Sequence, residues 1–206
     1  MNETVSLLAE DLTQKDRYRT MIRLIVPRPI AWVSTVGTSG IKNLAPFSFF
    51  NAVSSDPPIV MISFASKSDG TQKDTLRNIL DTKELVINIV KESDLKKMIE
   101  TSKDYPYGVD EFEECGINSI PSLTVAPPRL ESSPISLECT LDSIKEYIGD
   151  AHLKTTVVFA KIKMFHILKS EYKDGKPDPF SFKPLARLGG QDYAALERLE
   201  PNDEVV

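Results

Sequence analysis

Alternation between apolar and polar positions is clearest near the C-terminal end of the chain, where it indicates long β-strands. Residues 155–168, "TTVVFAKIKMFHIL", carry apolar side chains at positions 158, 160, 162 and 164 and lysines at 161 and 163. Residues 135–148, "ISLECTLDSIKEYI", alternate in places. Because a period of two places successive side chains on opposite faces of a sheet, both segments are predicted to be strands.

Shorter apolar runs predict four more strands in the first half. Residues 30–36 and 41–53 flank the turn sequence "GTSG" and form a predicted hairpin. After a break at residues 56–58, "DPP", residues 59–65, "IVMISFA", are almost continuously apolar. Such a run is typical of a strand buried on both faces. Residues 84–90, "ELVINIV", form the fourth strand.

Helical spacing is confined to three short segments. Residues 16–24 predict a turn or two of helix. A polar loop, residues 67–78, leads into a helix that Asp74 or Thr75 is expected to cap, with apolar positions 76, 79 and 80 on one face. A second amphipathic helix is expected to begin at Ser93, with apolar positions 95, 98 and 99.

The order of these elements defines the fold class. The first 16 residues read as an extended arm, and residues 104–135 are irregular and proline-rich, with one helical turn near 110–114. A stretch of that length is a covering loop or a binding loop. Many short strands without a βαβ repeat predict a mainly β protein, a closed antiparallel barrel or a sandwich, and not a doubly wound sheet.

Composition and charge exclude several classes of function. The 206 residues have a net charge of -5, which argues against a sequence-independent nucleic-acid binder. No apolar run approaches the roughly 18 residues that a membrane span requires. The N-terminus is acidic and polar and so is not a secretory signal. These features predict a cytoplasmic protein that binds neither nucleic acid nor membrane.

Cysteine and histidine are too scarce for a metal site to be expected. The chain has two cysteines, Cys115 and Cys139, and two histidines, His152 and His166, with no ligand-type spacing among them. One disulfide and two free thiols are equally compatible with this count. Motifs for a Rossmann site, a P-loop and a GxSxG nucleophile are also missing from the sequence.

The polar loop at residues 67–78 is a candidate phosphate site. Lys73, Thr75, Arg77 and Asn78 lie at the start of the predicted helix. A helix N-terminus presents unpaired N–H groups, and a lysine and a hydroxyl add charge-assisted hydrogen bonds. The alternative is a solvated loop with an ordinary capping residue.

Residues 43–58, "NLAPFSFFNAVSSDPP", combine rings with small polar side chains. Phe47, Phe49 and Phe50 offer apolar surface, and Ser48 and Asn51 offer hydrogen bonds. A flavin ring has apolar faces and polar edges, and the protein around it tunes its electronics. The alternative is that the phenylalanines are core residues. Ser34 and Thr35 lie at the end of a predicted strand. Either their hydroxyls face a ligand, or they are ordinary residues of a strand end.

Four motifs occur in the order and spacing of a known family. They are "VPRPIAWVST" (residues 26–35), residues 43–58, "KDTLRNI" (73–79) and "ELVINIV" (84–90), with a weaker "ARLGG" at 186–190. Together they resemble the flavin reductase-like proteins with an FMN-binding split barrel, in particular the group of flavoredoxin and the reductase component of nitrilotriacetate monooxygenase. The resemblance spans about residues 17–193 and implies a single domain over residues 1–206.

The resemblance implies a six-stranded antiparallel Greek-key split β-barrel, a homodimer, and FMN held near the subunit interface. It implies reduction of flavin by NAD(P)H and electron transfer to free flavin, a partner monooxygenase, an electron-transfer protein or another acceptor. No side chain is assigned as a catalytic acid or base. The implied cofactor-binding residues are Trp32, Val33, Ser34, Thr35, Ser48, Phe49, Asn51, Ser63, Phe64, Lys73, Thr75, Asn78 and Arg187.

Each motif carries its own implied role. Residues 32–35 run beside the flavin and ribityl chain, and positions 48, 49 and 51 border the ring and ribityl. Positions 63 and 64 enclose the phosphate, while positions 73, 75 and 78 bind it. Arg187 lies near the flavin, contributed either by the same chain or by the partner chain.

One departure from the family pattern leaves the electron donor open. Many short members carry "GDH" before the final long strand, and that histidine lies near flavin and nicotinamide. This chain has "GDAHLKTTVVF", with His152 displaced by one residue. A non-catalytic FMN electron carrier without a nicotinamide site is therefore an alternative to a reductase. A third possibility is a split barrel that binds another ligand, such as haem, or none, although few histidines are available as haem ligands.

Overall fold

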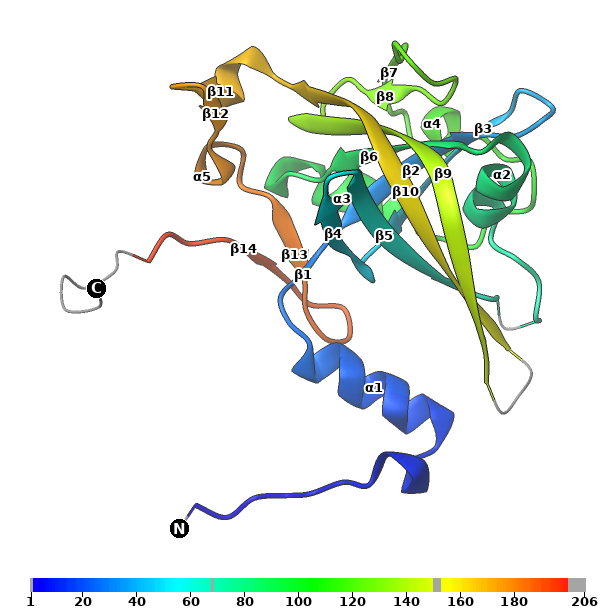
Figure 1. Cartoon of the computed structure of the whole chain (residues 1–206), viewed down its shortest axis with the longest axis vertical. Helices are drawn as coiled ribbons and strands as arrows, with labels where there is room; N and C mark the ends of the chain where they lie inside the picture. Colours follow the sequence, from blue (N-terminus) through cyan, green and yellow to red (C-terminus); the bar gives the residue numbers. More distant parts are fainter. Residues whose placement is uncertain (1, 68, 150–152, 200–206) are drawn as a thin grey trace.

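The computed structural model describes residues 2–67, 69–149 and 153–199. Within them, seven strands form one sheet in the order β3-β2-β6-β9-β10-β5-β4, and every pair in it is antiparallel. The strands are β2 (Ala31–Val36), β3 (Lys42–Phe47), β4 (Phe50–Ser55), β5 (Pro58–Ala65), β6 (Glu84–Ile89), β9 (Ile135–Ile148) and β10 (Lys154–Ile167) (Figure 1). The predicted mainly β fold is confirmed.

The strand count differs from the predicted six because residues 41–53 form two strands. Ser48 and Phe49 separate β3 from β4, and these two strands are the opposite edges of the sheet. A connection of two residues between opposite edges requires the sheet to curl strongly, as in a split barrel. The predicted hairpin of β2 and β3 is present, with Thr35 opposite Asn43.

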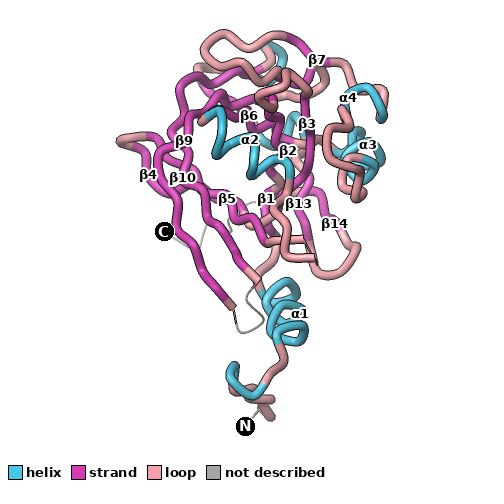
Figure 2. Tube along the Cα trace, turned by 90° about the vertical axis from the view of Figure 1, so that its right-hand side faces the viewer, coloured by secondary structure: helices cyan, strands magenta, loops and turns pink. Residues whose placement is uncertain are grey.

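Smaller elements surround this sheet. A three-stranded sheet has the order β1-β13-β14, and β7 pairs with β8 and β11 with β12. The strands are β1 (Arg28–Pro29), β7 (Ser119–Ile120), β8 (Arg129–Leu130), β11 (Tyr172–Lys173), β12 (Lys176–Pro177), β13 (Leu185–Arg187) and β14 (Tyr193–Ala195). Figures 1 and 2 place β1 and β13 between the main sheet and α1.

The described helices are short. They are α1 (Gln14–Leu24), α2 (Asp74–Thr82), α3 (Leu95–Glu100), α4 (Glu111–Glu114) and α5 (Pro179–Phe182), with 3-10 turns at Ala9–Asp11, Glu92–Asp94 and Lys169–Glu171. The predicted helix at 16–24 and the turn near 110–114 are confirmed. α1 begins after Thr13, whose hydroxyl oxygen accepts from the Asp16 N–H at 3.2 Å, a typical N-cap.

Three local predictions need correction. α2 is preceded by Lys73 and not capped by Asp74 or Thr75, because Asp74 pairs with Lys67 and the Thr75 hydroxyl accepts from Asn43. α3 begins after Asp94, because a 3-10 turn occupies the residues around Ser93. In β5, Met61 and Ser63 are only half-buried, since their face borders a cavity.

Two apolar clusters hold the molecule together. The larger joins the inner face of the main sheet to α2 through residues such as Ile62, Ile79 and Val158. The smaller packs Trp32 and Met98 with residues of β3, α4 and β8. Their fully buried side chains supply the hydrophobic stabilisation expected of a domain core.

A buried carboxylate fastens the long loop that follows β7. Glu138 accepts hydrogen bonds from the Leu123 N–H at 2.7 Å and from the Thr124 N–H at 2.6 Å, and it contacts His166 Nε2 at 2.6 Å. Burial on its own raises the pKa of Glu138, but the hydrogen bonds, the strongest from the Thr124 hydroxyl, lower it to about 2. The loop is therefore tied to the sheet by an ionised group.

Candidate functional site

Three adjoining cavities form one groove along residues 43–51. The lysine cavity is lined by Asn43, Ala45, Pro46, Phe47, Lys67, Lys73, Asp74, Thr75, Thr101, Ser102, Lys103, Asp104, Tyr105 and Glu111. The arginine cavity is lined by Tyr18, Ile22, Arg28, Ile30, Pro46, Phe47, Ser48, Met98, Ser102, Arg187, Gly190 and Tyr193. The apolar cavity is lined by Met21, Ile25, Pro27, Arg28, Pro29, Ser48, Phe49, Phe50, Asn51, Met61, Ser63 and Val157.

Shared walls make these cavities continuous. The lysine and arginine cavities share Pro46, Phe47 and Ser102. The arginine and apolar cavities share Arg28 and Ser48. Their volumes are about 130, 210 and 360 Å³ in that order. The end of β3 and the corner after it thus run along a groove with a charged end and an apolar end.

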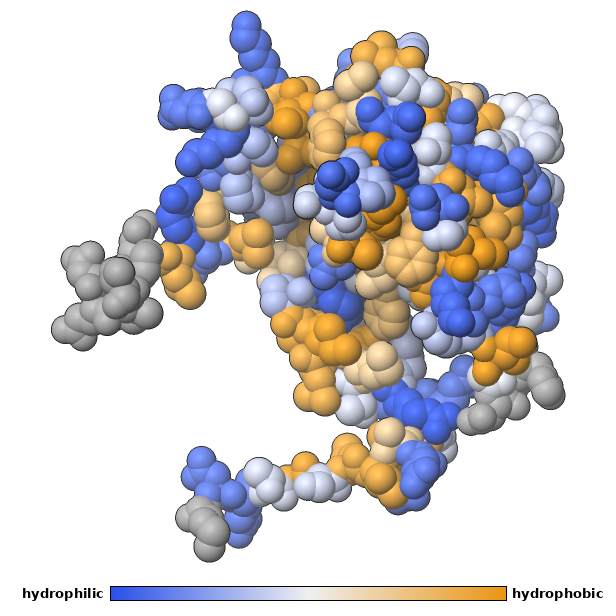
Figure 3. All heavy atoms as spheres, viewed as in Figure 1, coloured by the Kyte–Doolittle hydropathy of each residue, from blue (hydrophilic) through white to orange (hydrophobic). Residues whose placement is uncertain are grey.

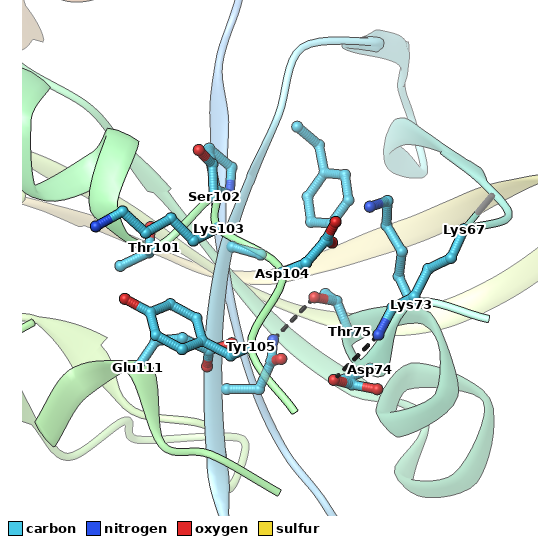
Figure 4. Close-up of a pocket in the computed structure, with 14 residues that line it drawn as sticks. Lys67, Lys73, Asp74, Thr75, Thr101, Ser102, Lys103, Asp104, Tyr105 and Glu111 are labelled. Atoms are coloured by element: carbon cyan, nitrogen blue, oxygen red, sulfur yellow. Dashed lines mark hydrogen bonds and ion pairs between the residues drawn. The ribbon is translucent and has the colours of Figure 1, made fainter. Parts of the chain in front are cut away.

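The lysine cavity gathers hydrogen-bond donors at the start of α2 (Figure 4). Thr75 is buried, and its hydroxyl oxygen accepts from Asn43 Nδ2 at 2.8 Å. A hydroxyl also donates once, and among the described residues the Thr75 hydroxyl donates no hydrogen bond. Lys67 Nζ lies 3.8 Å from Asp74, and Lys73 immediately precedes the helix. An anion placed here meets two ammonium groups, a hydroxyl and the helix N-terminus.

Glu111 is the buried carboxyl of this cavity. Its Oε2 accepts from the Leu44 N–H at 2.9 Å, and its side chain is buried. Burial raises the pKa of Glu111 to about 7, and the charges of Asp74 and Asp110 add to the rise. The charge of the lysine cavity therefore changes near neutral pH. In the same cavity, the hydrogen bond to Cys115 raises the pKa of Tyr105 to about 12, so this phenol stays neutral.

The arginine cavity has a different charge balance. Arg28 is buried, and its Nη1 donates to the carbonyls of Ile22 and Ile25 at 2.7 and 2.6 Å. Burial lowers the pKa of Arg28, as does the nearby Arg187, while Tyr18 raises it. An arginine nevertheless stays protonated in proteins. Arg187 donates to the Tyr193 hydroxyl and lies 4.4 Å above the Tyr193 ring.

The apolar cavity lies between α1 and the outer face of β5. The Arg28 guanidinium carbon is 5.8 Å from the centre of the Phe49 ring, within the range of a cation–π contact. Ser63 N–H donates to the Phe49 carbonyl at 2.9 Å, which fixes the corner to β5. Asn51 and Met61 complete this wall. The cavity suits a flat ring with a polar edge.

The structure brings seven of the thirteen predicted positions into the groove. These are Ser48, Phe49, Asn51, Ser63, Lys73, Thr75 and Arg187. Arg77, named with the loop, instead lies over the Tyr107 ring at 4.3 Å.

The other six predicted positions lie outside the three cavities. Trp32, Val33, Ser34, Thr35 and Phe64 are fully buried, with Trp32 donating to Thr101 at 2.9 Å. Asn78 donates to the Thr35 hydroxyl at 3.0 Å and borders a fourth, small cavity, which shares Asn43 and Asp74 with the lysine cavity. These side chains support the walls of the groove and do not line it.

Several groove residues were missed by the sequence reasoning. They are Tyr18, Arg28, Asn43, Lys67, Glu111 and Tyr193. Arg28, Asn43 and Lys67 belong to the motifs and the loop named in the sequence analysis, so their polar side chains were a usable signal. Glu111 and Tyr193 carry no such sequence signal, because only the tertiary fold brings them to the groove. His152, which bears on the electron donor, lies outside the described residues.

The described part of the chain has neither a metal-type cluster of side chains nor a membrane-spanning helix. No group of three or more histidine, cysteine, aspartate or glutamate side chains there is arranged to hold a metal ion. No helix there is long and apolar enough to cross a membrane.

Comparison with known proteins gives the groove a family context. An uncharacterized protein of Aquifex aeolicus is 39% identical over 177 residues, covering 85% of this chain and 88% of its own length. The crystal structure of nitrilotriacetate monooxygenase component B from Bacillus cereus superposes with a TM-score of 0.92 at 31% identity, covering 97% of this chain and 100% of that one.

A second solved structure is also similar over almost its whole length. It is the 2-nitrobenzoate 2-nitroreductase NbaA of Pseudomonas fluorescens, with a TM-score of 0.85 at 28% identity and 98% of both chains covered. The family model for the flavin reductase like domain matches residues 22–185, which include all three cavities apart from Tyr18, Met21 and positions after 185. The chain therefore belongs to the flavin reductase-like family.

Proposed function

We propose that this protein binds FMN and acts as a flavin-dependent oxidoreductase. The lysine cavity carries the proposal, because it unites Lys67, Lys73 and the free hydroxyl hydrogen of Thr75 at the N-terminus of α2. This donor set fits a phosphate monoester, which FMN has and riboflavin lacks. Family membership and the two similar structures support the flavin.

The groove suggests how the cofactor lies. The phosphate would occupy the lysine cavity, and the ribityl chain would follow Pro46 and Phe47. The ring would reach Ser48 and the apolar cavity, where Phe49 and Met61 exclude water. Bound FMN supplies the redox chemistry. The protein's contribution is to bind, to orient and to shield, and no side chain is required as a general acid or base.

NAD(P)H is the proposed electron donor, and the acceptor is free flavin, a partner oxygenase or a small organic molecule. The resemblance to a monooxygenase component supports an oxygenase partner. The resemblance to a nitroreductase supports direct transfer to a small molecule. Anaerobic addition of NADH or NADPH to the FMN-loaded protein tests the donor. Bleaching of the flavin absorption supports a reductase, whereas a flavin that only dithionite bleaches would support an electron carrier.

We also propose a homodimer. Met21 and Leu24 on α1 and Ile25, which follows this helix, are 47, 75 and 56% exposed. Figure 3 shows hydrophobic atoms at the C-terminal end of the helix. Exposed apolar surface beside an apolar cavity is typical of a protein interface. The molar mass in solution, measured by light scattering, tests this; a monomer with bound FMN would exclude a dimeric flavin site.

FMN titration of two variants tests the phosphate assignment. Lys73→Ala and Thr75→Ala are each expected to weaken FMN binding about tenfold or more, because each removes a charge-assisted hydrogen bond. Riboflavin, which lacks the phosphate, should be unaffected by either change. Lys96→Ala, an exposed lysine on α3, is the matched control. Unchanged FMN affinity in both variants would refute the assignment.

A further inference from the structure

The short β1–β13 ladder sets two arginines opposite each other. Arg28 and Arg187 are register partners, and both line the arginine cavity. Like charges directly opposite in an antiparallel ladder are destabilising. In the described ranges, neither guanidinium forms an ion pair with a carboxylate. The protein thus maintains an uncompensated pair of cations inside a cavity.

The two arginines are held in different ways. Arg28 is 7% exposed and uses its Nη groups on main-chain carbonyls, including that of Leu188 at 2.9 Å. Its buried Nε has no hydrogen-bond partner among the described residues. Arg28 is therefore a fixed charge in the cavity wall, able to attract an anion without moving.

Arg187 is the arginine that reaches the open part of the cavity. It is half-buried, and its described hydrogen bonds go to the Tyr193 hydroxyl and the Gly190 carbonyl. These bonds orient the side chain but use two of its five N–H donors. A planar guanidinium with spare donors matches a carboxylate, which it can bind through two parallel hydrogen bonds.

The remaining walls favour a flat, small ligand. Tyr18, Phe47 and Tyr193 surround the cations with rings, and aromatic rings pack well against other rings. The cavity holds about 210 Å³, less than the roughly 300–1,000 Å³ typical of sites for drug-sized molecules. Because this cavity opens into the two beside it, its volume sets no upper limit on the ligand. The paired cations and the surrounding rings are what favour a single ring with a carboxylate.

We propose that the arginine cavity binds the carboxylate of a small aromatic or heteroaromatic acid, with Arg187 as the direct contact and Arg28 as the supporting charge. Ser48 and Arg28 also line the apolar cavity, so this acid would lie beside the ring position given above. The inference that this acid is a substrate rests on the proposed function, whereas the inference that it binds does not.

Calorimetric titration of the full-length protein with benzoate and with benzamide tests the proposal. Benzamide has nearly the same shape but no charge, so benzoate should bind about tenfold more tightly or better. Arg187→Gln should abolish this preference, and Arg187→Lys, which keeps the charge but loses the planar fork, should retain part of it. Arg198→Gln, which removes an exposed arginine paired with Asp178, should leave the preference intact.

Three results would overturn the inference. They are equal binding of benzoate and benzamide, no binding of either, and an unchanged preference in Arg187→Gln. Inorganic phosphate that displaces benzoate at equal concentration would also overturn the choice of a flat carboxylate. If Arg187→Gln does not fold, an unchanged preference in Arg187→Lys is the overturning result.

Titrations with and without FMN separate this inference from the proposed function. A benzoate preference in a protein that does not bind FMN would support the anion site and refute the flavin assignment. FMN binding without any preference for benzoate would support the flavin assignment and refute the anion site. With both bound, benzoate should perturb the visible spectrum of the flavin, because the two ligands would be neighbours.

Discussion

The lysine cavity and the arginine cavity share a wall, yet they differ in the balance of cationic and carboxyl side chains that line them. In the lysine cavity, Lys67, Lys73 and Lys103 face Asp74, Asp104 and Glu111, so cations and carboxyl groups are equal in number. In the arginine cavity, Arg28 and Arg187 face aromatic, aliphatic and small side chains and no carboxyl group. The first can adjust its charge with pH through Glu111, whereas the second is permanently positive. Two neighbouring sites in one groove can therefore select different anions.

The sharpest way to separate the two cavities is to remove the positive charge of one. The double variant Lys67→Ala/Lys73→Ala should weaken FMN binding by about 10³-fold, or about 4 kcal/mol, because two charge-assisted hydrogen bonds are lost. Benzoate binding should not change, as measured by calorimetry of both ligands on one preparation. If both ligands weaken together, the cavities act as a single site and the comparison fails.

The titratable carboxyl gives the lysine cavity a pH dependence that the arginine cavity should lack. The pKa of Glu111 rises from 4.5 to about 7 on folding, so the folded state binds more protons between these values. The free energy of unfolding should then fall as pH rises through this window. Glu111→Gln removes the fall and should stabilise the protein at pH 8 by on the order of 3 kcal/mol, with little effect at pH 4.

Urea denaturation at pH 4, 6 and 8 measures this difference. Gln keeps an oxygen that can accept from the Leu44 N–H, so the change tests charge and not shape. The FMN affinity of Glu111→Gln at pH 8 should also exceed that of the parent, because a negative charge is removed near the phosphate. A variant whose stability follows the same pH curve as the parent would contradict the raised pKa.

A smaller effect is expected from the hydroxyl that joins the two elements of the lysine cavity. Thr75→Val keeps the shape but leaves the buried Asn43 side chain without its partner at 2.8 Å. The free energy of unfolding should fall by about 1–2 kcal/mol, as thermal or urea denaturation would show. Thr82→Val on the same helix, whose hydroxyl is only partly buried, provides a matched comparison. If the free energy of unfolding fell equally in both variants, burial of the hydrogen bond between Asn43 and Thr75 would add nothing to stability.

The smallest effect should come from a cation outside both cavities. Arg198 pairs with Asp178 at 3.3 Å, and both side chains are largely exposed. Arg198→Gln should change stability by less than about 0.5 kcal/mol and should leave FMN and benzoate binding unchanged. A clear loss of either ligand would show that charge acts over the whole surface and not within the groove.

Much of the fold was predictable because it follows from local patterns. Alternation located β9 and β10, and apolar runs located β2, β5 and β6. The division of residues 41–53 into β3 and β4 was not predictable, because neither Ser48 nor Phe49 is a turn-forming glycine or proline. The curl of the sheet, which brings its two edges to the same corner, imposes that break, and the curl depends on all seven strands.

The residues of the candidate site also fall into those that local sequence patterns predict and those that depend on the whole fold. Lys73 and Thr75 could be found from sequence because a helix N-terminus is a local feature. Arg187 was named from its motif, but its pairing with Arg28 could not be found, because Arg28 and the Leu188 carbonyl that it contacts are 160 positions apart. Residues 32–35 carry a recognisable motif, but their side chains are interior. A motif marks what a fold requires, and it does not by itself distinguish a ligand contact from its support.

The two-residue corner between β3 and β4 also limits how this protein can diversify. Ser48 and Phe49 join opposite edges of the sheet, and the Ser63 N–H fixes the corner to β5. An inserted residue would shift the register of β4 and turn its side chains to the other face. A substitution at Ser48 changes the wall between two cavities and leaves the register alone. New ligand preferences are therefore more accessible to this lineage through point substitutions at the corner than through changes in its length.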